Sequence, residues 1–229
     1  MYKILIADDD VELTNLLTEY LQNEGFTTET ANDGEAALNM ASESQYDIII
    51  LDIMMPKMNG FDVLRQLRTQ SQVPVLMLTA RGEDVDSIIG LEIGADDYLA
   101  KPCNPRVIVA HIRAILRRAD TSSTENDSIK INKLELNRGS RQVHLNKHLI
   151  SMTSTEFQIL EVLMDNAGNV VTKELLSELA LGKTLSPYDR SLDMHISNLR
   201  KKLTSASEQN NWIITVRGVG YQFVMFEHE

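Results

Sequence analysis

The 229-residue sequence predicts two domains: a doubly wound α/β domain built on a five-stranded parallel sheet, and a smaller domain of helices and antiparallel strands. Short apolar runs alternate with amphipathic stretches through the first half of the chain, which is typical of parallel strands covered by helices on both faces. The second half opens with an alternating polar and apolar segment and closes with a hairpin pattern. A chain of this length is also long for a single core.

Five apolar or β-branched runs are the expected strands of the first domain: residues 3–7, 27–31, 47–51, 75–79 and 98–100. The run at 27–31 has the weakest pattern, and its loss would leave the predicted fold class unchanged. Between the first two runs, apolar side chains recur at the spacing of one helix face, which predicts an amphipathic helix. The residues of that face are Leu13, Leu16, Leu17, Tyr20 and Leu21.

Polar residues end or directly follow four of these five strands. They are Asp8, Asp9, Asp10, Asp52, Thr79 and Lys101. Because ligands bind at the carboxyl ends of strands in an open parallel sheet, these side chains are expected to meet at one edge. Carboxylate oxygens suit Mg²⁺, and a carboxylate beside Mg²⁺ can attack a phosphoryl group. Taken singly, each residue could equally be a solvated polar group at the end of a strand.

Residues 119–128, ADTSSTENDS, contain one apolar residue and no periodicity, which predicts a linker. The acidity lies before it: residues 1–120 hold 10 Lys+Arg and 20 Asp+Glu, whereas residues 121–229 hold 12 and 13. Within 190–217 the balance turns basic, so a polyanionic partner is allowed there. The sequence has no apolar run of the ~20 residues that span a membrane, and its one cysteine, Cys103, cannot form an intrachain disulfide. We therefore expect a cytoplasmic protein.

The second domain begins with residues 129–150, whose alternation predicts a small antiparallel sheet with a turn at Arg138–Gly139. A capping box, Thr153 to Glu156, opens a first helix, and a second helix starts near Thr172. The third helix, about 187–203, carries a core stripe of Leu192, Ile196, Leu199 and Leu203. Its opposite side presents Arg190, Met194, Ser197, Asn198 and Lys201. Residues 212–224 read as a hairpin around Arg217.

Several motifs carry a resemblance to two-component response regulators. ILIADDD, LDIMMPKMNG, LTARG and GADDYLAKP resemble the receiver domain, and TSTEFQIL, DMHISNLRKKL and TVRGVGYQF resemble the winged helix-turn-helix domain of the OmpR/PhoB subfamily. LGKTLSPYDRSLDMHISNLRKKL is similar to envelope-stress regulators of that subfamily. The resemblance implies a flavodoxin-like receiver at 1–118, a linker at 119–128 and a DNA-binding domain at 129–229. It also implies phosphorylation by a sensor histidine kinase and transcriptional regulation.

By match to the receiver motifs, the resemblance makes Asp52 the phosphoacceptor. Asp9, Asp52 and the Met54 carbonyl would bind Mg²⁺, and Asp8 would act through a water molecule. Lys101 would hold a phosphoryl oxygen, and its bond to Pro102 should be cis. Thr79 and Tyr98 resemble the switch pair, for which the plain alternative is a core threonine beside a buried aromatic ring.

Asp10 matches no ligand position in the receiver family. Its place just before the first helix fits a helix N-cap better.

By match to the winged-helix motifs, Asn198 and Arg217 are the candidates for reading bases. The residues expected to contact backbone phosphates are Arg190, His195, Ser197, Arg200, Thr215 and Tyr221. The loop 182–190 corresponds to a segment that meets RNA polymerase in the subfamily, although an ordinary connection explains it equally well.

Subfamily members usually dimerise through the fourth helix, fifth strand and fifth helix, using ion pairs across the interface. Here Ser87 stands where a basic residue is usual, Val107 where an acid is usual, and His111 where arginine is usual. We still expect a homodimer favoured by phosphorylation, with His111 near Asp97.

Two readings compete with a transcriptional regulator. A phosphatase of the haloacid dehalogenase type also uses a nucleophilic aspartate, but it needs a second acid two residues later, and that place holds Met54. We therefore do not expect an enzyme. The other alternative is a phosphate carrier whose second domain binds protein. That alternative does not explain the basic third helix or the hairpin that carries Arg217.

Overall fold

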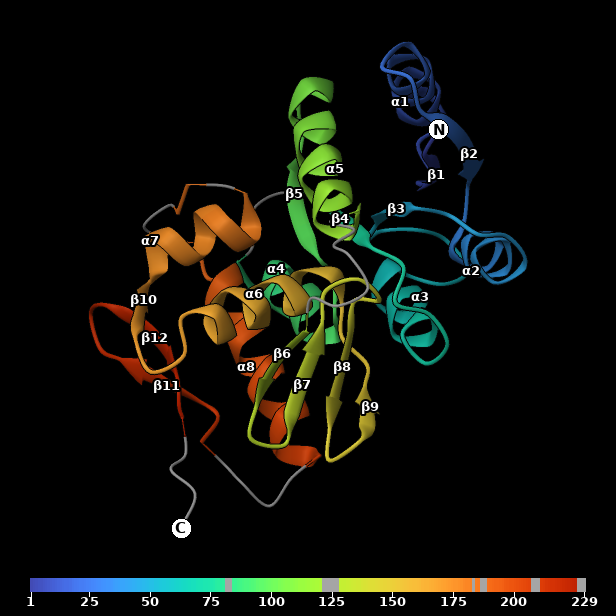
Figure 1. Cartoon of the computed structure of the whole chain (residues 1–229). Coiled ribbons are helices and arrows are strands. Elements are labelled where there is room, and N and C mark those ends of the chain that lie inside the picture. Colours follow the sequence, from blue (N-terminus) through green and yellow to red (C-terminus); the bar gives the residue numbers. More distant parts are fainter. Residues whose placement is uncertain (81–83, 121–127, 183, 186–188, 207–210, 226–229) are drawn as a thin grey trace. The chain divides into compact units, whose positions relative to one another are not determined.

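A computed structural model describes the chain except for residues 81–83, 121–127, 183, 186–188, 207–210 and 226–229. The chain divides into two compact units, Met1–Leu116 and Arg117–Glu229, which we treat separately (Figure 1). Most of the predicted linker, 119–128, lies outside the described residues. Helix α5 (Pro105–Asp120) and strand β6 (Ser128–Ile131) each reach into its predicted range by one or two residues.

The first unit is built on the predicted parallel sheet. Its strands are β1 (Lys3–Ala7), β2 (Thr27–Ala31), β3 (Ile48–Asp52), β4 (Val75–Ala80) and β5 (Asp97–Lys101). Their order in the sheet is β2-β1-β3-β4-β5, and all neighbours are parallel. The doubly wound α/β prediction is therefore confirmed, including the weak strand at 27–31.

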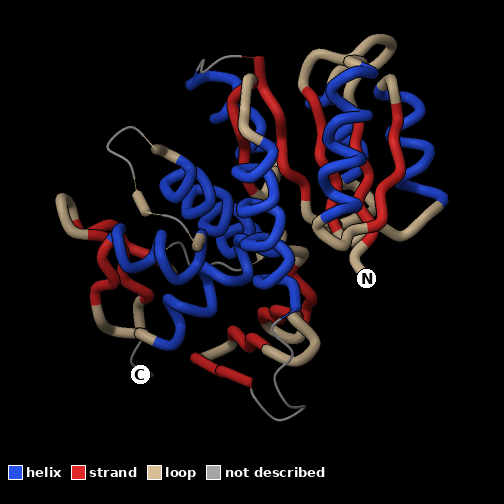
Figure 2. The backbone as a smooth tube through the Cα atoms, turned by 90° about the horizontal axis from the view of Figure 1, so that it is seen from above, coloured by secondary structure: helices blue, strands red, loops and turns tan. Residues whose placement is uncertain are grey.

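Helices cover both faces of this sheet (Figure 2). They are α1 (Val11–Asn23), α2 (Gly34–Glu43), α3 (Gly60–Leu67), α4 (Asp84–Ile93) and α5. Alternate strand residues such as Ile4, Ile6 and Ile50 pack with apolar residues of α1 and α5. Because all five strands are parallel, their carboxyl ends lie at one edge of the sheet.

Helix α1 begins where the sequence predicted, because Asp10 caps it. The Asp10 Oδ1 accepts hydrogen bonds from the backbone N–H groups of Glu12 and Leu13, each at 3.0 Å. Leu17 and Leu21 of the predicted apolar face are buried. The placement of Leu16 on that face was wrong: its side chain is 53% exposed, and Thr14 is buried instead. Leu16 and Thr14 lie at opposite margins of that face, and the margin that packs on the core is the one that carries Thr14.

The second unit contains two antiparallel sheets and a helical layer. One sheet has the order β6-β7-β8-β9, with β7 (Leu134–Asn137), β8 (Gln142–Leu145) and β9 (His148–Ile150). The predicted turn at Arg138–Gly139 joins β7 to β8. The other sheet has the order β10-β12-β11, from β10 (Val170–Thr172), β11 (Ile213–Val216) and β12 (Gly220–Phe223). The hairpin predicted around Arg217 is thus confirmed.

The helices of this unit are α6 (Ser154–Asp165), α7 (Lys173–Leu176), a π-helical turn η1 (Ser177–Leu181) and α8 (Ser191–Ser205). The capping box is formed: the Glu156 N–H donates to Thr153 Oγ1 at 3.3 Å, and the Thr153 N–H donates to Glu156 Oε2 at 2.9 Å. Helix α8 begins at Ser191, whereas the sequence predicted a start near 187. Residues 186–188 lie outside the described range.

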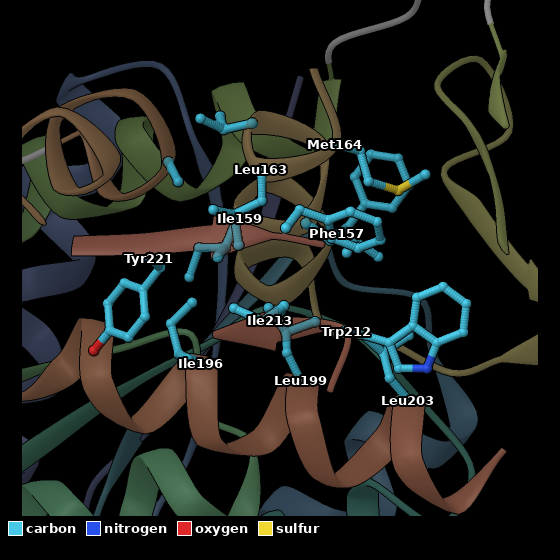
Figure 3. Close-up of a cluster of buried hydrophobic side chains, with 14 of the residues drawn as sticks. Phe157, Ile159, Leu163, Met164, Ile196, Leu199, Leu203, Trp212, Ile213 and Tyr221 are labelled. Atoms are coloured by element: carbon cyan, nitrogen blue, oxygen red, sulfur yellow. The ribbon is translucent and has the colours of Figure 1, made fainter. Parts of the chain in front are cut away.

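The apolar stripe of α8 faces the core of the unit. Figure 3 shows Ile196, Leu199 and Leu203 pointing from α8 toward residues of α6 and β11. Leu192 completes the buried stripe, as predicted. Asn198, predicted on the opposite side, is only 6% exposed. In the part of the chain that the structure describes, no helix has the length and apolarity needed to span a membrane.

Candidate functional site

Three carboxylates gather at the carboxyl edge of the parallel sheet. Asp8 and Asp9 follow β1, and Asp52 is the last residue of β3. One oxygen from each lies within 4.8 Å of the others. Asp8 and Asp52 are buried, at 0% and 2% exposure, whereas Asp9 is exposed. An all-oxygen donor set with one solvated member suits a hard cation that keeps part of its water shell.

The ammonium group of Lys101, at the end of β5, joins two of these carboxylates. Its Nζ lies 2.6 Å from Asp8 Oδ2 and 2.5 Å from Asp52 Oδ1. Burial raises the pKa of Asp52, although Lys101 and the Met54 N–H, which donates to Asp52 Oδ2 at 2.6 Å, favour the anion. Burial disfavours the Lys101 cation, but its hydrogen bonds to Asp52 and Asp8 raise the pKa of Lys101 overall. The site therefore holds buried negative charge beside a fixed positive charge.

The loop that follows Asp52 returns closely to its strand. The Gly60 N–H donates to the Ile53 carbonyl at 2.9 Å. A Cβ atom on Gly60 would lie 2.1 Å from the Asp52 carbonyl oxygen, so only glycine fits here. The Met54 side chain is 70% exposed at the mouth of the site. The peptide bond between Lys101 and Pro102 is cis, as the sequence predicted.

The predicted switch residues lie on the two neighbouring strands. Asp52 pairs with Leu78, and Thr79, the next residue of β4, pairs with Ala100. Thr79 is 1% exposed, and its hydroxyl has no hydrogen-bond partner among the described residues. A buried hydroxyl normally has a partner, so this one is available to a new oxygen at the sheet edge. Tyr98, on β5, is half-buried.

Several charged residues of the expected dimer face form ion pairs within the first unit. His111 Nδ1 lies 2.7 Å from Asp97 Oδ2, as the sequence predicted. Arg113 contacts Glu24 at 2.7 Å, and the buried Asp96 contacts Arg68 at 3.4 Å.

The two other altered positions on that face are Val107 and Ser87. Val107 is 42% exposed. The side chain of Ser87 lies outside the described residues.

The candidate DNA-contacting residues surround α8 and the β11–β12 hairpin. Arg190, Thr215 and Arg217 are exposed, and Ser197 and Arg200 are half-buried. Three others are buried: His195 at 1%, Asn198 at 6% and Tyr221 at 3% exposure. In the loop 182–190, Lys183 and residues 186–188 lie outside the description.

Sequence reasoning missed a polar cluster that ties α8 to this hairpin. The Tyr221 hydroxyl donates to Asp193 Oδ1, and Lys173 Nζ lies 2.6 Å from the same oxygen. Arg200 donates to the Ile213 carbonyl and to Thr215 Oγ1, both at 2.8 Å. These partners are distant in the sequence, so no local pattern signals them.

Known proteins resemble the chain over nearly its whole length. The family described as "Response regulator receiver domain" matches residues 4–113, and "Transcriptional regulatory protein, C terminal" matches residues 146–223. The chain is 49% identical to "Transcriptional regulatory protein CpxR" of Escherichia coli strain K12, covering 98% of this chain and 99% of that protein. It is 48% identical to a CpxR homolog of Haemophilus influenzae, covering 98% and 100%.

Two solved structures also match over both domains. A mutant of RitR matches with a TM-score of 0.76 and 27% identity, covering 97% of this chain and 99% of that one. The Thermotoga maritima response regulator DrrB, an OmpR/PhoB homolog, matches with a TM-score of 0.53 and 32% identity, covering 98% and 99%.

Proposed function

The chain belongs to the two-component response regulators of the OmpR/PhoB type, with a receiver and a DNA-binding domain, and from that premise we propose that Asp52 is its phosphoacceptor. The observation that carries the proposal is the Lys101 ammonium, which lies within 2.6 Å of both buried carboxylates. On the neighbouring strand, the Thr79 hydroxyl has no hydrogen-bond partner among the described residues. This arrangement places the Asp52 carboxylate, which would act as the nucleophile, beside the Lys101 ammonium, which would bind a phosphoryl oxygen.

In the proposed reaction an Asp52 carboxylate oxygen attacks the phosphorus of a phosphohistidine on the sensor kinase. The new P–O bond forms as the P–N bond breaks, and the imidazole leaves with the bonding electron pair. Lys101 then shifts its ammonium hydrogen bonds from Asp52 to a phosphoryl oxygen. Asp9, Asp52 and the Met54 carbonyl, with Asp8 through water, would hold Mg²⁺, which supplies charge neutralisation for the transferred group.

Phosphorylation would change the conformation of the receiver through contacts to the new phosphoryl oxygens. The Thr79 hydroxyl turns toward them and donates a hydrogen bond, and Tyr98 fills the space that Thr79 leaves. The surface formed by α4, β5 and α5 then favours a homodimer. This dimer binds two direct-repeat half-sites about one helical turn (~34 Å) apart.

On DNA, we assign base reading to Arg217 and phosphate contacts to Arg190, Ser197, Arg200 and Thr215. Asn198, the other candidate for reading bases, and His195 and Tyr221, the other candidates for phosphate contacts, are buried, so these three side chains would have to turn outward to touch DNA. The exposure of Arg190, Thr215 and Arg217 supports these roles directly. Tyr221 and Arg200 also hold the hairpin against α8. We propose that the loop 182–190 meets RNA polymerase.

The remaining assignments follow the same family pattern. We propose a receiver at 1–118, a linker at 119–128, a DNA-binding domain at 129–229, and a cytoplasmic location. The regulator is of the envelope-stress type, as the similarity to CpxR proteins supports.

A gel shift on duplex DNA, with and without acetyl phosphate, tests the function. The wild-type chain should bind DNA, and acetyl phosphate should tighten the complex. Asp52→Ala should bind as the untreated wild type does under both conditions. Arg217→Ala should weaken binding without changing the effect of acetyl phosphate. Absence of any DNA complex would favour the phosphate carrier with a protein-binding second domain.

A further inference from the structure

The outer face of the four-stranded sheet carries a basic pocket that lies outside the proposed functions. The cavity has a volume of about 290 Å³, and its lining includes Lys130, Lys133 and Lys147. Figure 1 shows this sheet apart from the β10–β12 sheet. The residues that line the pocket belong to β6, β7, β8 and the turns that join these strands to one another and to β9, and none belongs to α8 or to the β11–β12 hairpin.

The strand register explains why the lining side chains point outward. Leu134, Leu136, Val143 and Leu145 are buried, so the residues between them on β7 and β8 face away from the core. Across the sheet, Lys130 pairs with Glu135, and Glu135 pairs with His144. These three side chains form one row on the outer face.

Two tight turns close the pocket at the end of that row. Asn132 adopts a φ of 55°, and Asn146 and Lys147 adopt φ values of 54° and 68°. The Asn146 N–H donates to the Lys133 carbonyl at 3.0 Å, which fixes one turn against the other. Lysines from a strand and from two turns therefore line one concave site whose turns are held together.

Charge and hydrogen bonding both favour an anion there. Three lysines face one carboxylate, Glu135, and that acid is only 3.8 Å from Lys130 in an exposed pair, which water screens. Asn132 also lines the pocket, and its Nδ2 is a buried donor without an acceptor in the described part of the chain. The excess of cations over acceptors in the lining favours an acceptor-rich ligand.

We propose that this pocket binds a phosphate group. A compact anion with several oxygens matches a small concave site with cations on more than one side, whereas an extended acidic peptide would need a longer groove. The phosphate can come from a free ligand or from the DNA backbone, and the test separates these sources.

The test is a titration of the full-length ¹⁵N-labelled chain with inorganic phosphate and with pyrophosphate, in EDTA and at constant ionic strength set by chloride. Backbone amide signals of Asn132, Lys133, Asn146 and Lys147 should shift saturably. The double variant Lys133→Gln, Lys147→Asn removes two charges, and asparagine suits the positive φ at 147. It should weaken binding about tenfold or more, which corresponds to roughly 1.4 kcal/mol. Arg106→Ala, an exposed charge change on α5, should leave binding unchanged.

A gel shift then separates the two sources. If the double variant weakens DNA binding and lowers its salt dependence, the phosphate belongs to DNA. If DNA binding is unchanged while the pyrophosphate shifts are lost, the ligand is a free phosphate compound. Shifts that chloride reproduces, shifts that the double variant retains, or a response only to a glutamate-rich peptide would overturn the proposal.

Discussion

At the scale of single residues, the account depends on one ammonium that serves two buried carboxylates. Asp8 and Asp52 are almost inaccessible to water, and burying two anions together is costly unless a cation compensates them. Lys101 supplies that cation through contacts of 2.6 and 2.5 Å. A divalent ion held by the same carboxylates would supply compensation as well.

We predict that Lys101→Met lowers the free energy of unfolding by about 2 kcal/mol in EDTA, because it leaves buried carboxylates without their cation. Mg²⁺ should restore much of this loss, since it supplies positive charge to the same oxygens. Urea unfolding with EDTA and with Mg²⁺ measures both values. Lys57→Met, which removes an exposed ion pair with Asp33, is the control and should show no such Mg²⁺ dependence. An equal loss of stability in EDTA and in Mg²⁺ would contradict the claim that Lys101 and Mg²⁺ compensate the same carboxylates.

A second residue-scale prediction concerns alkaline pH. Burial, and then the hydrogen bond that the hydroxyl donates to Glu29, raises the pKa of Tyr46 to about 12 from 10.0. The unfolded chain loses this proton first, so the stabilisation is complete below pH 10 and is lost as the pH rises toward 12. Denaturant midpoints across this range should fall less steeply for Tyr46→Phe than for wild type. Tyr2→Phe, the matched control, should retain the wild-type slope.

At the scale of elements, the start of α3 is pressed against the strand that bears Asp52. We predict that Gly60→Ala costs about 2–3 kcal/mol, because its Cβ would meet the Asp52 carbonyl oxygen at 2.1 Å. Gly90→Ala, in α4, should instead be neutral or stabilising, by up to about 1 kcal/mol. The nearest atoms to its Cβ are side-chain atoms at 3.5 and 3.6 Å. Thermal unfolding of the two variants gives the comparison, and similar stabilities would rule out this close packing.

The contact between α6 and α8 uses one of two neighbouring lysines that look alike in the sequence. Lys202 Nζ lies 2.6 Å from Oε2 of Glu156, which is 1% exposed, whereas Lys201 is exposed. We predict that Lys202→Ala costs about 1–3 kcal/mol by leaving a buried carboxylate with one partner fewer. Lys201→Ala should change stability by less than about 0.5 kcal/mol. Chemical denaturation distinguishes them, and equal effects would refute the structural role of Lys202.

These elements show which features a sequence can predict. The positions of Asp8, Asp52 and Lys101 follow from strand ends, because parallel topology brings those ends to one edge. The capping box is local and was equally predictable. By contrast, helical periodicity placed Asn198 on the open side of α8, yet it is buried. Periodicity gives the direction of a side chain on its helix but not what neighbouring elements cover.

At the scale of the whole molecule, an acidic receiver is joined to a domain that binds a polyanion. Residues 1–120 hold ten more acidic than basic residues, counted from 20 and 10, so the receiver does not itself attract DNA. Two residues of the expected dimer ion pairs are already used within their own unit: Asp97 contacts His111, and Arg113 contacts Glu24. A dimer on that face must share or replace these contacts.

The most direct test is the mass of the chain and of its peptides after incubation with acetyl phosphate. With Mg²⁺, the chain should gain one phosphoryl group, and the gain should lie on Asp52, in the peptide that contains residues 48–57. EDTA or Asp52→Ala should abolish it. A phosphoryl group on another residue, or one that survives the loss of Asp52, would contradict the central claim.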